Sequence, residues 1–166
     1  MHKILIIGDL MLDCYVFGSS NRISPEAPVP IMAQNKLEYV VGGAGNVAAN
    51  CSLRINDVVL LGALSNDNAG KLFQKQMSYY KNIKAKYLRN ERTTMKTRFI
   101  ANGQQMLRVD DERVFNIASS KIRHALKKPN NFEYAVISDY AKGVCDDIQS
   151  IIAENPNIKF FVDPKG

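Results

Sequence analysis

The run Lys3-Ile4-Leu5-Ile6-Ile7, which ends at Gly8-Asp9, decides the fold of this chain. An unbroken run of Leu and β-branched residues is typical of a strand that is buried on both faces in a parallel sheet. Similar runs occur at residues 58–61, 134–137 and 160–162, and helical patterns lie between them at 46–53, 69–79, 118–126 and 146–153. This alternation predicts an α/β fold: a layered domain with a mostly parallel sheet that is flanked by helices.

Two segments interrupt this alternation. Residues 19–30 contain three prolines and cannot form a central strand, while residues 31–41 have an extended pattern. Residues 93–110 contain Asn102-Gly103 between two extended runs, and this pair favours a hairpin because a type I′ turn needs positive φ at both central residues. We therefore expect a small antiparallel β lid, formed by about residues 14–41 and 93–110, beside the parallel sheet. No linker indicates a second domain.

The composition is that of an ordinary globular protein. Of the 166 residues, 46% are hydrophobic and 23% charged, which excludes a disordered or fibrous chain. The net charge of +6 suits an anionic ligand but is modest for a nucleic-acid binder, and we expect no nucleic-acid partner. Three scattered cysteines and two histidines do not indicate a metal site or a disulfide framework. No apolar run approaches the roughly 18 residues of a membrane span, so we expect a reduced, cytoplasmic protein without a membrane partner.

A carboxylate follows three of the predicted strands. These residues are Asp9, Asp139 and Asp163. Ligands of open α/β sheets bind outside the carboxyl ends of the strands, so the three acids are expected to face one crevice. Each acid by itself could instead cap the following helix or turn. The occurrence of three such acids favours a site.

The segment Gly42-Gly43-Ala44-Gly45-Asn46 opens a predicted helix. Its free backbone N–H groups and the helix dipole could bind an anion or a sugar hydroxyl. Gly43, Gly45 and Ala48 also match a dinucleotide-binding fingerprint, which would indicate an oxidoreductase. The dinucleotide-binding interpretation is disfavoured, because the fingerprint should follow the first buried strand and should be followed by an acid about 20 residues later. This sequence meets neither condition.

Basic residues are frequent between residues 81 and 98. Most of them are expected to form a solvated face. Lys96 and Arg98 differ, because they alternate along a predicted hairpin strand and therefore share one face of it. Arg108 on the return strand could join them.

The chain resembles the ribokinase-like (PfkB) carbohydrate kinases. The resemblance rests on Gly8-Asp9-Leu10-Met11-Leu12-Asp13 after the first strand, on the Pro-rich lid segment and on Gly42-Gly43-Ala44-Gly45-Asn46-Val47-Ala48. Within the family, three motifs are similar to the heptose 7-phosphate kinase domains of bifunctional ADP-heptose synthases: Asn21-Arg22-Ile23-Ser24-Pro25-Glu26-Ala27-Pro28-Val29-Pro30, Ser138-Asp139-Tyr140-Ala141-Lys142-Gly143 and Val162-Asp163-Pro164-Lys165-Gly166. Residues 1–166 are then expected to be the N-terminal part of one ribokinase-like kinase domain, and the fold to be incomplete.

This resemblance implies ATP-dependent phosphorylation of D-glycero-β-D-manno-heptose 7-phosphate at its anomeric hydroxyl, a step in making the inner-core heptose of lipopolysaccharide. The implied cofactors are ATP and Mg²⁺. Asp13 matches the acid that binds sugar hydroxyls in the family, and Gly42, Gly43 and Asn46 line the same pocket. A dianionic phosphate needs charge-assisted donors, for which Arg22, Lys96, Arg98 and Lys142 are the candidates. Asp9, Arg108 and Asp139 are further candidates for substrate binding, and Asp163 and Lys165 for nucleotide binding.

The sequence departs from the family in one important respect. It contains no Gly-Ala-Gly-Asp motif, which carries the catalytic base of these kinases at the start of a late helix. No catalytic residue is therefore assigned, and the 166 residues alone are expected to be inactive. A smaller departure is Gly45, where relatives tend to have Ala.

The alternative is a non-catalytic sugar-phosphate binding or regulatory module. The apolar run at residues 160–162 favours half of an enzyme, because it would leave an exposed strand at the edge of the sheet. We also expect a homodimer through the β lid, because a lone layer of two or three strands, with Phe99 and Val109 on its apolar face, has little to pack against.

Overall fold

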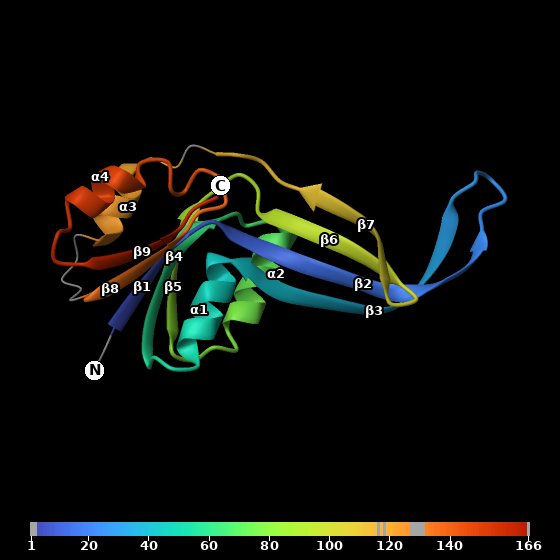
Figure 1. Cartoon of the computed structure of the whole chain (residues 1–166), viewed down its shortest axis with the longest axis horizontal. Helices are drawn as coiled ribbons and strands as arrows, with labels where there is room; N and C mark the ends of the chain where they lie inside the picture. The colour runs from blue at the N-terminus through green and yellow to red at the C-terminus, as the bar shows by residue number, and fades with distance from the viewer. Residues whose placement is uncertain (1–2, 116, 118, 127–131, 166) are drawn as a thin grey trace.

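The computed structural model describes residues 3–115, 117, 119–126 and 132–165. Its body is a parallel sheet with strand order β5-β4-β1-β8-β9 (Figure 1). The strands are β1 (Lys3–Gly8), β4 (Asp57–Leu64), β5 (Ile83–Arg89), β8 (Tyr134–Ser138) and β9 (Lys159–Asp163). The predicted α/β fold is confirmed. At the β9 end of the described sheet, Phe161 and Val162 are about half exposed.

Helices cover both faces of the parallel sheet. They are α1 (Ala44–Ser52), α2 (Asn68–Met77), α3 (Ser119–Leu126) and α4 (Ile148–Ala153) (Figure 1). Ile4 and Ile6 of β1 pack in one core with α1 and α2, whereas Leu5 and Ile7 pack in a second core that includes side chains of α3 and α4. Two apolar faces explain why β1 is an unbroken hydrophobic run. No helix in the described part of the chain is both long and apolar enough to cross a membrane.

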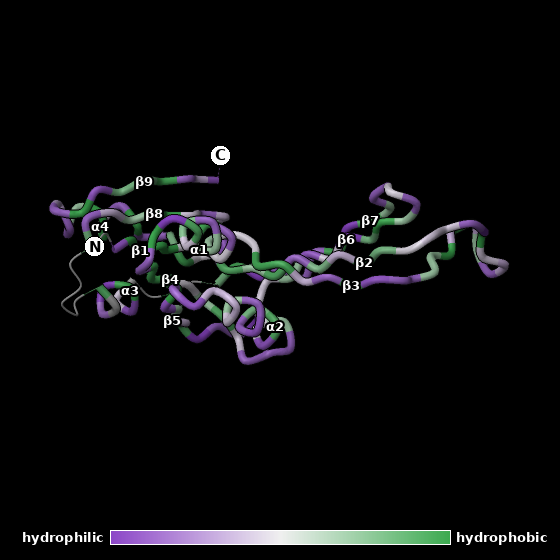
Figure 2. Tube along the Cα trace, turned by 90° about the horizontal axis from the view of Figure 1, so that it is seen from below, coloured by the Kyte–Doolittle hydropathy of each residue, from purple (hydrophilic) through white to green (hydrophobic). Residues whose placement is uncertain are grey.

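A second sheet projects from the body as a long arm, and we call it the lid sheet (Figures 1 and 2). Its strands are β2 (Leu10–Ile23), β3 (Pro30–Gly43), β6 (Thr94–Ala101) and β7 (Gln104–Asp111), in the order β3-β2-β6-β7. The predicted hairpin turn is confirmed, since φ is +52° at Asn102 and +79° at Gly103.

The lid sheet is mixed, whereas a wholly antiparallel layer was expected. β2 pairs with β3, and β6 with β7, in antiparallel fashion, but β2 and β6 are parallel. The physical reason is that β2 and β6 both enter the arm from the carboxyl ends of strands in the body sheet, so they run in the same direction.

Strand β5 was not predicted from the sequence. Its sequence IKAKYLR alternates between half-buried residues such as Ile83 and exposed ones such as Lys84. The expectation of a solvated basic face is correct for Lys84 and Lys86, which point outward from this strand. The same alternation is the signal for a half-buried strand.

Candidate functional site

The candidate site lies where the lid sheet joins the body. β1 ends at Gly8 and β2 begins at Leu10, so Asp9 is the one residue between the two sheets. β3 returns to the same point and ends at Gly43, where α1 begins. The backbone N–H of Ala44 donates to the carbonyl oxygen of Asp9 at 3.0 Å, which fixes the start of α1 against this junction.

The Asp9 carboxylate is buried, with 1% of the residue exposed. It accepts hydrogen bonds from the backbone N–H groups of Tyr140 (2.8 Å), Lys142 (3.1 Å) and Val144 (3.3 Å). Burial raises the pKa of Asp9, and the three N–H donors oppose that rise. The observed contacts of Asp9 thus hold the loop after β8 in place, and direct binding of a sugar by Asp9 stays a prediction.

Gly42 and Gly43 are required by close approaches at the end of β3. Gly43 has a φ of +55°, and a Cβ there would collide with the carbonyl oxygen of Asp9. A Cβ on Gly42 would collide with Oδ2 of Asp13. Both glycines therefore let the Asp9 backbone and the Asp13 carboxylate lie against the start of α1.

The N-terminus of α1 is open towards this junction. Its N-cap residue, Gly43, offers no side chain to the first N–H groups of the helix, and the first turn contains no acid. Asn46 lies in that first turn, and its Oδ1 accepts a hydrogen bond from Asn50. Apart from the N–H of Ala44, which donates to Asp9, the first-turn N–H groups can therefore donate to an anion or a sugar hydroxyl.

Asp13 forms an ion pair with Arg98 at 2.5 Å, and both side chains are about four-fifths buried. The pair spans β2 and β6, which lie in register with Asp13 next to Lys96 and Tyr15 next to Arg98. The Arg98 guanidinium also lies over the ring of Tyr15, at 5.2 Å from its centroid. The hydrogen bond to Asp13 raises the pKa of Arg98, so this cation stays charged.

A second group of charges surrounds Glu112. Its carboxylate accepts hydrogen bonds from Lys96 of the lid sheet (2.9 Å) and from Lys142 of the loop after β8 (2.7 Å). Lys142, and then Lys96, lower the pKa of Glu112. Burial lowers the pKa of Lys96, but its hydrogen bonds to Asp110 (2.8 Å) and Glu112 outweigh that effect and raise it. Glu112 thus links the lid sheet to the body.

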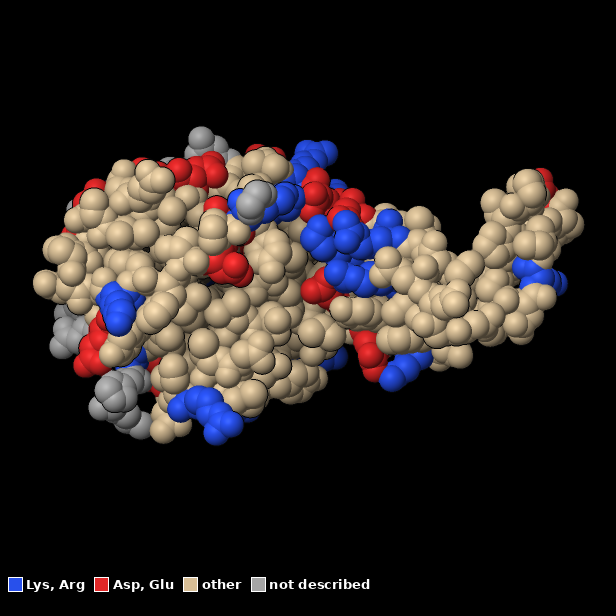
Figure 3. All heavy atoms as spheres, viewed as in Figure 1, with Lys and Arg blue, Asp and Glu red and all other residues tan. Residues whose placement is uncertain are grey.

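Arg108 completes this charged face, because it lies opposite Arg98 in the β6–β7 register and pairs with Asp110 at 2.9 Å. Figure 3 shows basic and acidic side chains gathered where the arm meets the body. The face combines four cations, Lys96, Arg98, Arg108 and Lys142, with three acids, Asp13, Asp110 and Glu112. The positive and negative charges of this face are almost balanced. A bound phosphate would therefore pair with cations that now pair with carboxylates.

The structure separates Arg22 from this group. Arg22 lies nine residues beyond Asp13 on the same strand, near the tip of the lid sheet, and pairs in register with Ile31. Nine residues of strand span roughly 30 Å. Within one chain, Arg22 and the Glu112 group therefore lie at opposite ends of the lid sheet.

Asp139 follows β8 and Asp163 ends the neighbouring strand β9, and the backbone N–H of Asp139 donates to the carbonyl of Asp163 at 3.0 Å. Asp163 and Lys165 are exposed. Carboxylate oxygens suit Mg²⁺, but no group of three or more His, Cys, Asp or Glu residues in the described ranges could hold a metal by itself. The two acids fit a cation that substrate phosphates and water also bind.

Sequence reasoning missed Asp110 and Glu112. Both alternate with Arg108, so they lie on the same face of β7 and its extension as the cations that they pair with. Side chains alternate between the two faces of a strand, and the same alternation that groups Lys96 with Arg98 also groups these two acids with Arg108.

Comparisons with known proteins show the family to which the chain belongs. The family described as pfkB family carbohydrate kinase matches residues 1–160. The chain is 40% identical to the bifunctional protein HldE of Actinobacillus succinogenes and 39% identical to that of Histophilus somni, in each case over 99% of the chain and 36% of the relative. It therefore spans about a third of the length of these curated relatives.

Solved structures show the same fold. A carbohydrate kinase from Agrobacterium tumefaciens matches with a TM-score of 0.73 and 17% identity, over 98% of this chain and 53% of that one. The tetrameric inhibited form of phosphofructokinase-2 from Escherichia coli matches with a TM-score of 0.71 and 17% identity, over 100% of this chain and 56% of that one. At this identity the likeness concerns the fold.

Proposed function

This chain belongs to the pfkB family of carbohydrate kinases, and from that premise we propose that it forms the sugar-binding part of a kinase that transfers phosphate from ATP to the anomeric hydroxyl of D-glycero-β-D-manno-heptose 7-phosphate. The product would serve the synthesis of lipopolysaccharide inner-core heptose. The observation that carries the proposal is the position of Asp13. Its carboxylate lies against Gly42 on one side and Arg98 on the other, next to the open N-terminus of α1.

In this proposal the Asp13 carboxylate accepts hydrogen bonds from sugar hydroxyls, while first-turn N–H groups of α1 and the Asn46 amide bind further hydroxyls. The pairing with Arg98 supports this role, because it fixes the orientation of the Asp13 carboxylate. Gly42 supports it as well, since a larger residue would push the carboxylate out of place.

The 7-phosphate is assigned to the cations on the charged face. Lys96 and Lys142 both donate to Glu112, so their ammonium groups converge on one carboxylate from the lid sheet and from the body. A phosphate dianion that replaces or joins this carboxylate would gain two charge-assisted donors. Arg98 and Arg108 lie in adjacent strands of the same face and can extend the phosphate site.

The nucleotide is assigned to the carboxyl ends of β8 and β9, where Asp139, Asp163 and Lys165 lie, with Mg²⁺ between the acids and the phosphates. The catalytic base is proposed to lie outside these 166 residues. Two facts support this: the chain covers 36% of its HldE relatives, and it contains no Gly-Ala-Gly-Asp. We accordingly propose that the 166 residues alone do not catalyse the transfer.

Calorimetry of sugar binding tests the proposal. Asp13→Ala is expected to weaken binding of heptose 7-phosphate by about tenfold or more, because buried hydroxyls without a partner cost roughly 1–3 kcal/mol each. ATP binding is expected to stay unchanged. Asp57→Ala is the matched control, since Asp57 also pairs with a cation of the neighbouring strand, Lys84, at 3.0 Å, but lies at the amino end of β4.

Unchanged affinity of Asp13→Ala for heptose 7-phosphate would contradict the assignment of Asp13. Equal affinity of the unaltered protein for heptose with and without its 7-phosphate would contradict the assignment of the cations.

A further inference from the structure

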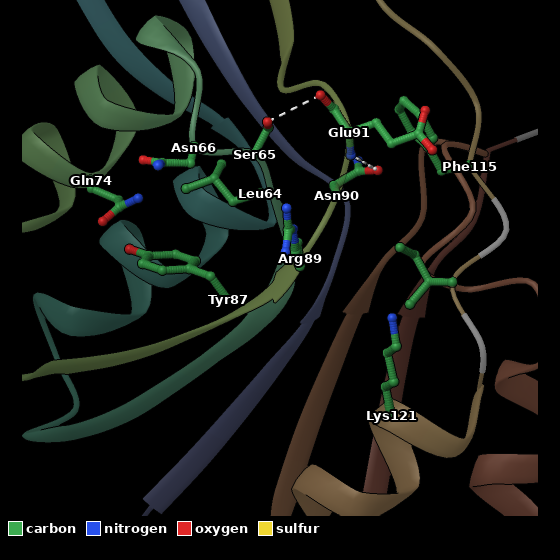
Figure 4. A pocket seen from close by; sticks show the side chains of 11 residues that line it. Leu64, Ser65, Asn66, Gln74, Tyr87, Arg89, Asn90, Glu91, Phe115 and Lys121 are labelled. Atoms are coloured by element: carbon green, nitrogen blue, oxygen red, sulfur yellow. Dashed lines mark hydrogen bonds between the residues drawn. The ribbon is translucent and has the colours of Figure 1, made fainter.

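A large cleft lies outside the site described above. It has a volume of about 1030 Å³ and is lined at the carboxyl ends of β4 and β5, by α2, and by the segment that leads into α3 (Figure 4). β5 is at the opposite end of the described parallel sheet from β9. None of the residues assigned to the sugar or the nucleotide lines this cleft.

One wall of the cleft is fixed by hydrogen bonds. The Ser65 hydroxyl donates to the carbonyl of Glu91 at 3.1 Å (Figure 4). The Ser65 N–H donates to the Thr93 hydroxyl at 3.1 Å. The Asp67 carboxylate accepts from the N–H groups of Thr93 and Gly70, at 2.8 and 2.7 Å. The loops after β4 and β5 are therefore bound to each other, and the wall is formed before any ligand enters.

Two cations face the cleft. In Figure 4 the Arg89 guanidinium lies between Leu64 and Asn90, and Lys121 extends from α3 towards the same space. Among the described residues, neither has an ion-pair partner, whereas Lys84, Arg92, Lys96, Arg98, Arg108, Arg123 and Lys142 all do. Glu91, the acid of this cleft, directs its side chain towards Phe115. The described lining thus carries two cations and one acid, which leaves a net positive charge for an anionic ligand.

The remaining lining is divided by chemistry. Leu64 and the Tyr87 ring lie on the α2 side together with the amides of Asn66 and Gln74, and Phe115 lies on the opposite side (Figure 4). Ile117 also lines the cleft. A ligand that satisfies this surface has an apolar or aromatic body for the apolar side chains, hydrogen-bonding groups for the amides and an anionic group for the cations. A phosphate dianion balances both cations at once.

We propose that this cleft binds a phosphate monoester with an aromatic or apolar body, at a site separate from the sugar site. Arg89 and Lys121 bind the phosphate, and Phe115 and Ile117 contact the body. Neither cation is engaged in a described ion pair, so both are available to the ligand without breaking an internal contact.

Phenyl phosphate is the probe that tests the proposal, with binding to the protein measured by calorimetry. Arg89→Gln and Lys121→Gln are each expected to weaken binding by about tenfold, the loss of one charge-assisted contact. Lys86→Gln is the matched control, because Lys86 is an exposed lysine of the same strand that does not line the cleft. Phenol and inorganic phosphate, which each lack one half of the probe, are expected to bind at least about tenfold more weakly.

The Lys96→Gln variant separates this site from the proposed 7-phosphate site. It is expected to bind phenyl phosphate as the unaltered protein does. Loss of binding in Lys96→Gln, with Arg89→Gln unaffected, would overturn the proposal, because the probe would then occupy the lid site. Absence of saturable binding at millimolar phenyl phosphate would overturn it too. Urea unfolding confirms that the exposed substitutions leave the fold intact.

Discussion

Asp9 and Asp13 lie four residues apart, yet their carboxylates have different partners. Asp9 is held by three main-chain N–H groups of the loop after β8, and Asp13 by the guanidinium of Arg98. Sequence reasoning could place Asp9 near a crevice because it follows a buried strand, whereas Asp13 was assigned through the resemblance to the carbohydrate kinases. It could not tell which acid is used by the backbone. That depends on the shape of the loop after β8, where Ala141 and Gly143 have positive φ.

The first prediction at this scale concerns Asp9. Asp9→Ala would leave three N–H groups of a partly buried loop without their acceptor, so we expect the free energy of unfolding to fall by at least about 2 kcal/mol. Urea denaturation measures this. Asp139→Ala is the control from the same loop: its carboxylate accepts one N–H bond, from Ala141, in an exposed position, and a much smaller loss is expected. Equal losses of unfolding free energy in the two variants would contradict the role of Asp9 in holding the loop after β8.

At the scale of elements, patterns of hydrophobicity and turn residues predicted most of the body. Strands β1, β4, β8 and β9 and all four helices were placed within a few residues of their observed bounds, because each buries an apolar face of clear period. Strand β5 was not predicted, because its lysines were interpreted as part of a charged surface segment. The parallel pairing of β2 with β6 was missed because it joins segments far apart in the sequence, which no local pattern encodes.

The packing of α1 against α2 gives a prediction at this scale. A Cβ on Gly45 would lie 2.7 Å from Cζ and 2.9 Å from Cε2 of Phe73, whose ring is fully buried. Ala is normally better than Gly inside a helix by about 1 kcal/mol, but overpacking a core costs roughly 1–3 kcal/mol. We expect Gly45→Ala to destabilise the protein by about 1 kcal/mol in thermal or urea unfolding.

The same substitution is expected to become stabilising when Phe73→Leu has first made room for the methyl group. A double-mutant cycle measures this coupling. If Gly45→Ala stabilised the protein with Phe73 in place, contact with the Phe73 ring would not be what limits the size of the side chain at position 45.

The whole molecule consists of a body and an arm whose two faces differ. One face of the lid sheet carries the charged site, and the other carries apolar side chains, of which Leu107 is 55% and Val109 47% exposed. An apolar face of this kind on a four-stranded sheet favours burial against a second copy of the sheet. Homodimerisation through the lid therefore remains our proposal for the assembly.

Substitution on each face tests the dimer. Leu107→Glu is expected to shift the protein to a monomer in analytical ultracentrifugation at high micromolar concentration, because it places a charge in the apolar interface. Val40→Glu should not do so, since Val40 is similarly exposed, at 44%, but lies on the charged face beside Asp13. A monomeric mass for the unaltered protein would contradict lid-to-lid pairing.

The central claim is that this chain binds heptose 7-phosphate for a kinase, and phosphoryl transfer tests it most directly. The measurement is ³¹P NMR of the full-length protein that carries this chain, mixed with ATP, Mg²⁺ and D-glycero-β-D-manno-heptose 7-phosphate. We predict a second sugar phosphorus signal, from the anomeric phosphate, that grows in step with ADP. We also predict that the rate of phosphoryl transfer falls by about tenfold or more in Asp13→Ala at limiting sugar concentration. ATP turnover with no second sugar phosphate, or equal transfer to heptose that lacks the 7-phosphate, would contradict the claim.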